Sequence, residues 1–124
     1  MKLLFTSIIF ILNSALVFSQ EAEFYLKEKT VKFPDTEQGE TLEHTFVFTN
    51  TGSSPLIIQN YEVACKCTKL ITPDKPIAPG EKGELLLTFD TKGKYEFQDR
   101  TVILTMNTKK KTEKLRFKVF VIVP

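Results

Sequence analysis

From about residue 20 onward, apolar and polar residues alternate with the two-residue period of half-buried β-strands. No window keeps a helical period for more than two turns, so the pattern predicts an all-β domain. Strands are predicted at residues 41–50, 56–63, 84–90, 101–107 and 113–123, after an initial strand or pair of strands within residues 24–33.

Turn chemistry separates these segments. Gly52 and Pro55 interrupt the chain after the strand at 41–50, and Pro79-Gly80 precedes the strand at 84–90. Residues 91–97, with Gly93, are predicted to form a loop that carries Tyr95 and Phe97. About seven short strands at roughly ten-residue spacing favour two packed sheets, because a single open sheet would leave an apolar face in water. We therefore expect an immunoglobulin-like antiparallel β-sandwich.

The first residues have the layout of a secretory signal peptide. Lys2 supplies the positive charge, and the mostly apolar run that follows ends at Phe18. This run is shorter than the ~20 residues of a membrane-spanning helix, so we expect residues 1–19 to be a signal peptide cut between Ser19 and Gln20. The alternative is an uncleaved N-terminal anchor. The domain itself is expected at residues 20–124, without a membrane span and in a secreted, periplasmic or extracellular location.

The charge of the chain argues against nucleic-acid binding. Its 17 basic and 15 acidic residues give a formal net charge of +2 at pH 7. Neutralising phosphates requires a concentrated basic face, and the only basic run is Lys109-Lys110-Lys111, which is typical of a solvated turn between strands. We therefore expect no nucleic-acid partner.

Cys65 and Cys67 are the only cysteines. In a strand their sulfurs would face the same way, with Cα atoms about 6.6 Å apart, near the upper limit for a disulfide. The pair therefore fits a local disulfide or paired thiols, a redox or mixed-disulfide role, or a soft-metal site. Two thiolates suffice for copper(I), whereas structural zinc needs four ligands. We expect no bound cofactor and keep Cys65 and Cys67 as metal-ligand candidates only.

The sequence offers few combinations of residues that could form a catalytic site. His44, the sole histidine, shares a face with Leu42 and Phe46 and is expected to be half-buried rather than to act as a base. The mature serines, Ser53 and Ser54, lie in a turn without the glycine-flanked setting of a nucleophile elbow. We expect no enzymatic activity.

Apolar residues also occupy positions opposite to the core register. A protein interface is predicted on the sheet that contains the last strand, for another protein or a second copy; pairing of an edge strand with an extended partner segment is a related route. The candidate interface residues are Val47, Ile103, Phe120 and Ile122, in a set that also includes Ile57 and Leu86. Phe120→Lys is expected to abolish association and leave the fold intact.

Several ordered motifs resemble one known family. They are residues 46–52 (FVFTNTG), 55–58 (PLII), 65–68 (CKCT), 77–83 (IAPGEKG) and 89–93 (FDTKG). This part of the chain, about residues 30–123, is similar to the domain-of-unknown-function family 1573, whose members resemble secreted bacterial proteins with an immunoglobulin-like sandwich, akin to the domains of major sperm protein and Hydin. The resemblance implies fold and export but no reaction.

The chain departs from the family pattern at Lys66, where the family has glycine, and this argues against a tight turn at the cysteine pair. The sequence therefore favours a noncatalytic binding or scaffolding module of the bacterial cell envelope. The alternative is a thiol module that binds copper(I) or exchanges disulfides through Cys65 and Cys67.

Overall fold

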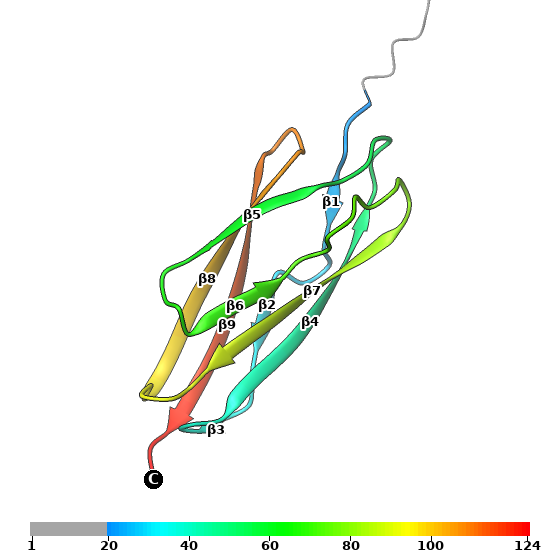
Figure 1. The fold of residues 1–124 in the computed structure, drawn as a ribbon. Coiled ribbons are helices and arrows are strands. Elements are labelled where there is room, and N and C mark those ends of the chain that lie inside the picture. The colour runs from blue at the N-terminus through cyan, green and yellow to red at the C-terminus, as the bar shows by residue number, and fades with distance from the viewer. Residues whose placement is uncertain (1–19) are drawn as a thin grey trace, which may run out of the picture.

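A computed structural model of the chain describes residues 20–124; the predicted signal segment at 1–19 lies outside the described residues. Nine strands and no helix occur in the described part. They are β1 (Phe24–Tyr25), β2 (Thr30–Lys32), β3 (Thr36–Glu37), β4 (Thr41–Asn50), β5 (Ile58–Val63), β6 (Thr68–Ile71), β7 (Lys82–Asp90), β8 (Glu96–Met106) and β9 (Thr112–Ile122) (Figure 1).

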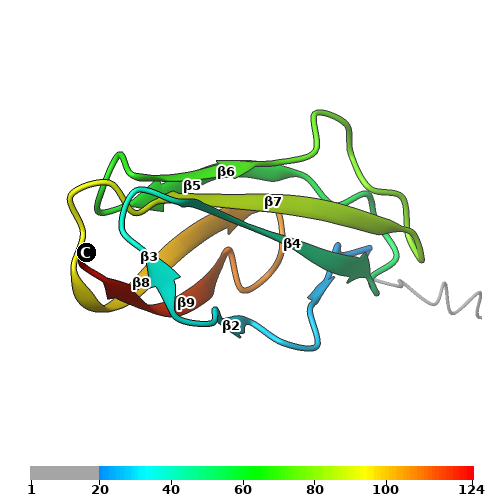
Figure 2. The same ribbon diagram turned by 90° about the horizontal axis from the view of Figure 1, so that it is seen from below.

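The strands form two sheets that face each other, as Figure 2 shows with β4 and β7 in one layer and β8 and β9 in the other. One sheet has the order β1-β4-β7-β6, and the other has the order β2-β9-β8-β5, with β3 also paired to β9. The immunoglobulin-like sandwich expected from the sequence is confirmed.

Alternate side chains of the long strands fill the space between the sheets. The largest fully buried ones are Phe48, Phe89 and Phe117, from β4, β7 and β9. Leu85 and Leu87 join them from one sheet, and Val102, Leu104, Met106, Leu115, Val119 and Val121 join them from the other. This burial of apolar surface is the main stabilising contribution to the fold.

Three features of the strands differ from the sequence prediction or go beyond it. The initial segment splits between the sheets, because β1 pairs antiparallel with β4 whereas β2 pairs parallel with β9. The strand β6 was not predicted, since only two of its four residues, Thr68 and Leu70, are buried, and so short an alternation gives little signal. The strand β8 begins at Glu96, so Phe97 lies in a strand and not in the predicted loop.

Asn50 anchors the start of the domain. Its amide nitrogen donates to Ser54 O (2.8 Å) and Ile77 O (2.9 Å), and its amide oxygen accepts from Glu23 N (3.2 Å) and Gly52 N (3.0 Å). At Gly52 an added Cβ would lie 2.1 Å from Glu21 O, so only glycine allows this close approach. The Asn50-Thr51-Gly52 motif therefore holds the chain in place from Glu21 onward.

Candidate functional site

The two halves of β8 differ in their neighbours. β9 pairs with β8 from Glu96 to Thr105, whereas β5 pairs with β8 only from Val102 to Met106. We call residues 96–101 the open half of β8, because in the described chain a strand flanks it on one side only (Figure 1).

The direction of the backbone groups in the open half follows from one hydrogen bond. Met106 N donates to Lys111 O at 2.8 Å, so the backbone of Met106 faces β9. Successive residues of an antiparallel strand direct their N–H and C=O groups to opposite sides. The N–H and C=O groups of Phe97 and Asp99 therefore face the side that β5 leaves open.

An apolar patch covers the outer face at this end of the sheet. We define the outer patch as Phe97, Phe120 and Ile122 on the outer face of β8 and β9, together with Tyr95, which directly precedes β8; they are 57, 43, 42 and 63% exposed. Phe97 lies opposite Phe120 in the pairing of β8 with β9. Side chains of this size gathered on one face are typical of a contact surface.

Backbone strain lies within the outer patch. Glu96, between Tyr95 and Phe97, has a φ of 60°, in the left-handed region that residues with a Cβ rarely adopt. Such strain costs of order 1–3 kcal/mol and concentrates at functional sites. Its place between the two most exposed aromatic side chains of residues 20–124 marks this segment as a candidate site.

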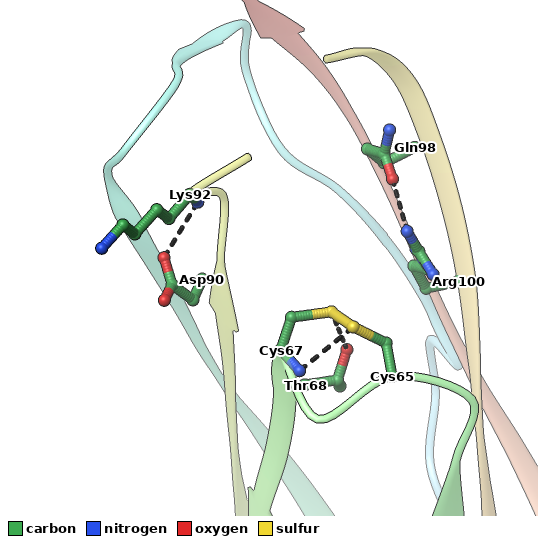
Figure 3. Close-up of a disulfide and its surroundings, with 7 residues drawn as sticks. All are labelled: Cys65, Cys67, Thr68, Asp90, Lys92, Gln98 and Arg100. Atoms are coloured by element: carbon green, nitrogen blue, oxygen red, sulfur yellow. Dashed lines mark hydrogen bonds between the residues drawn. A yellow bond between two sulfur atoms is a disulfide. The ribbon is translucent and has the colours of Figure 1, made fainter. Parts of the chain in front are cut away.

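The inner side of the open half is polar. Arg100 Nη2 donates to Gln98 Oε1 at 2.7 Å (Figure 3). Gln98 Nε2 in turn donates to Tyr95 O at 2.8 Å. The guanidinium of Arg100 lies 5.9 Å from the ring centroid of Phe89, a cation–π contact at the rim of the core. These contacts satisfy polar groups that point between the sheets at the open edge.

Cys65 and Cys67 form a disulfide in the turn between β5 and β6 (Figure 3). Thr68 N donates to Cys65 O at 3.1 Å, which closes a tight turn, and the two Cα atoms lie 5.1 Å apart. The pair therefore lies in a turn and not in the extended geometry considered from the sequence. Lys66 does not prevent the turn, because its φ is not positive and the turn does not require glycine.

A hollow of about 440 Å³ lies between the disulfide turn and β8. Its lining comes from Glu62, Val63, Ala64, Cys65 and Thr68 on one side and from Asp99, Arg100, Thr101 and Ile103 of β8 on the other. The hollow therefore begins where β5 leaves β8 and extends along the open half.

An ion pair interrupts the outer face beyond the patch. Arg116 Nε donates to Asp99 Oδ1 at 2.7 Å, and Arg116 Nη2 donates to Asp99 Oδ2. The hydrogen bond from Arg116 lowers the pKa of Asp99 below its ordinary value of 3.8, and the same bond raises the pKa of Arg116. This ion pair lies between the outer patch and Ile103 along β8.

The four predicted interface residues do not form one surface. Phe120 and Ile122 belong to the outer patch, whereas Val47 is 49% exposed on β4 of the other sheet. Ile103 is half-buried beyond the Asp99–Arg116 pair. Sequence reasoning did not include Tyr95 and Phe97 in the interface, although extending the alternation of 101–107 backwards through Asp99 would have placed Phe97 on the outer face of the same strand.

His44 is engaged by aromatic rings. Its ring is half-buried and lies edge-on to Phe46 and Phe33, with centroids 4.6 and 6.2 Å away. Within residues 20–124, no three His, Cys, Asp or Glu side chains gather in a way that could hold a metal ion. Nor does any helix in these residues have the length and hydrophobicity to cross a membrane.

Solved structures share this fold. A crystal structure of a protein of unknown function from Porphyromonas gingivalis W83 is similar with a TM-score of 0.74 and 16% identity, over 86% of this chain and 50% of that one. The PapD-like domain 7 of human CEP192 is similar with a TM-score of 0.64 and 13% identity, over 84% of this chain and 88% of that one. The E. coli chaperone DraB is similar with a TM-score of 0.53 and 16% identity, over 83% of this chain and 56% of that one.

At these identities the likeness shows the fold alone, and the chain spans half the length of the Porphyromonas protein. No curated protein matches the chain. The family described as "Protein of unknown function (DUF1573)" matches residues 24–121, a match that covers nearly all of the described domain. The chain therefore belongs to the DUF1573 family.

Proposed function

We propose that this domain is a noncatalytic protein-binding module of the bacterial cell envelope and that its outer patch contacts the partner. The single observation that carries the proposal is the outer patch itself: three aromatic side chains and Ile122, each at least 42% exposed, at one end of the sheet. Aromatic side chains are enriched at protein interfaces, where they supply large contact area at low entropic cost.

The state of the chemically reactive side chains supports a noncatalytic role. Both cysteine sulfurs are in the disulfide, and the ring of His44 packs against two phenylalanines. Cys65, Cys67 and His44 therefore do not form the nucleophile–base pair that covalent catalysis by a cysteine would use. The similar protein DraB from E. coli is described as a chaperone, which agrees with a binding role.

Export is part of the proposal. Among the described residues, the hydrogen bonds that hold the N-terminal segment begin at Glu21, whose carbonyl accepts from Ser53 N at 2.8 Å. A cut between Ser19 and Gln20 would therefore remove none of the residues that these bonds use. Mass spectrometry of the protein from envelope fractions tests this step: the expected N-terminus is Gln20, and a full-length chain in the membrane fraction would contradict it.

The binding step is tested with one patch variant and one matched control. A photoreactive phenylalanine analogue at position 95 should crosslink to a discrete partner in the native host. Phe120→Lys should abolish the crosslink, because it places a charge in the outer patch. Val47→Lys changes a similarly exposed residue on the other sheet and should leave the crosslink unchanged. Equal crosslinking in both variants, with both folded by circular dichroism, would refute the patch as the contact surface.

A thiol function is less well supported. The described residues hold one cysteine pair, already joined, and no third ligand beside it. If the double variant Cys65→Ser/Cys67→Ser retains the crosslink, partner binding does not depend on thiol chemistry.

A further inference from the structure

We infer that the open half of β8 adds a strand from a partner protein, with main-chain hydrogen bonds to Phe97 and Asp99. The inference rests on the proposed function and specifies the chemistry of the partner: an extended segment with an apolar side chain that packs against Phe97. The N–H and C=O groups at the edge of a sheet have no partner strand and can form hydrogen bonds with an added strand. Such strand addition is an established mode of peptide recognition.

The other edges of the sandwich are less suited to this role. Among the described strands, β4 also has one neighbour only from Thr41 to Phe48, because β1 pairs with just Thr49 and Asn50. Its outer face there is mostly polar, with Val47 as the single apolar side chain after Thr41, Glu43 and Thr45. β1, β2, β3 and β6 are 2, 3, 2 and 4 residues long, and such short edges pair poorly with an added strand. β5 is longer, but its register shifts between Ile58 and Asn60, and irregularities of this kind protect an edge. The open half belongs to an 11-residue strand that β9 holds extended along its length.

The surroundings of the open half fit an extended segment. A strand added beside Phe97 would direct alternate side chains to the outer face, where they extend the row formed by Phe97 and Phe120. The hollow beside Asp99 and Thr101 leaves room for side chains at the other end of such a segment. The outer patch, the open backbone groups of Phe97 and Asp99, and the hollow therefore follow one another along the same edge of the sheet.

A second copy of this chain is a poor occupant. Antiparallel pairing of two open halves about a two-fold axis at Asp99 would place Phe97 opposite Thr101 of the copy. An axis at Gln98 would place Phe97 opposite Asp99 of the copy, so neither arrangement continues the apolar row of the outer face. A two-fold axis at Phe97 would require Tyr95 to continue the strand, but the positive φ of Glu96 ends the regular extended backbone there. The pairing geometry thus favours a segment from a different protein that places an apolar residue opposite Phe97.

The two variants that test the inference differ in whether residue 99 carries a backbone N–H. Asp99→Pro removes the N–H that faces the open side, whereas Asp99→Ala removes the same ion pair with Arg116 and keeps the N–H. Phage-displayed random dodecapeptides are selected on the wild-type domain and then tested on both variants. We expect enriched peptides with alternating apolar residues that bind Asp99→Ala and lose at least about tenfold in affinity for Asp99→Pro, the effect of losing a main-chain bond in the added strand.

Amide hydrogen exchange gives a readout that holds even if Asp99→Pro fails to fold. In the free wild-type protein the amides of Phe97 and Asp99 should exchange fast, and those of Gln98 and Arg100, which face β9, should be protected. A selected peptide should slow exchange at Phe97 and Asp99 by roughly tenfold or more. Unchanged exchange at both amides with peptide bound, or protection that instead grows with the concentration of the protein itself, would overturn the inference.

The inference and the proposed function can fail separately. If the crosslinked partner is lost in Phe120→Lys but retained in folded Asp99→Pro, the outer patch binds a partner without strand addition, and only the inference fails. If neither substitution affects the crosslink, the proposed contact surface fails as well.

Discussion

The two halves of β8 pair with the same strand, β9, but differ in what lies on their other side. From Val102 to Met106 the strand is flanked by β5 and contributes three fully buried apolar side chains, Val102, Leu104 and Met106. From Glu96 to Thr101 one side is open, the inner side chains are Gln98 and Arg100, and Phe97 faces outward.

Because of this difference, one half of β8 contributes to the stability of the fold and the other half is available for binding a partner. An inward-pointing charge on an open edge discourages indiscriminate strand pairing, and Arg100 is such a charge, held by Gln98 and the ring of Phe89. The paired half therefore fixes the strand in the core, and the open half can expose backbone groups without being held by a second neighbour. Four substitutions test this division, from the largest expected effect to the smallest.

Leu104→Ala should cause the largest loss, because Leu104 is fully buried in the paired half. Deleting a leucine side chain in a packed core costs about 2–5 kcal/mol of unfolding free energy. Urea denaturation followed by circular dichroism measures this loss of unfolding free energy. A loss below about 1 kcal/mol would mean that the paired half is packed no better than the open half.

Removing the disulfide should have a moderate effect. The bond joins residues separated by 2 in sequence, so it closes a very short loop, and its removal by Cys65→Ser/Cys67→Ser should cost about 1–2 kcal/mol by the chain-entropy estimate. Amide exchange should rise in the turn where β5 leaves β8 but stay slow at Leu104. Faster exchange at Leu104 would show that the turn holds the paired half together.

Arg100→Ala should cost less, about 0.5–1 kcal/mol, because it removes a cation–π contact and a hydrogen bond at the rim of the core. The variant should also associate more readily through the exposed edge, which light scattering would reveal. Arg100→Lys keeps the charge and should remain monomeric. Equal association of both variants would assign the protection of the edge to something other than the charge.

Asp99→Asn should have the smallest effect, and the effect should depend on pH. The hydrogen bond from Arg116 lowers the pKa of Asp99 in the folded protein, so the carboxylate stabilises the fold above the ordinary value of 3.8. That contribution is lost as the pH falls through the lower pKa of the folded state. Thermal midpoints of Asp99→Asn and wild type should thus differ slightly at pH 7 and converge as the pH falls below the folded-state pKa of Asp99. A constant difference would show that the ion pair is not its source.

The candidate site was only partly predictable. Phe120 and Ile122 were found because they lie out of register with the core stripe of the last strand, a strictly local signal. Val47 gives the same local signal but lies on the other sheet, since a two-residue period says which residues face away from the core and not which strands share a sheet. Phe97 was placed in a loop because Gln98 and Arg100 break the apolar alternation that marks the rest of β8.

By itself the sequence determined the all-β class, the long strands and the core stripes, because burying alternate side chains is a property of each segment and its period of two. It did not determine which edge stays open. Tertiary structure decided that, since β5 turns away after Val63 into the disulfide turn and leaves half of β8 with one neighbour. An unpaired backbone results from the meeting of distant segments, so no local pattern of side chains encodes it.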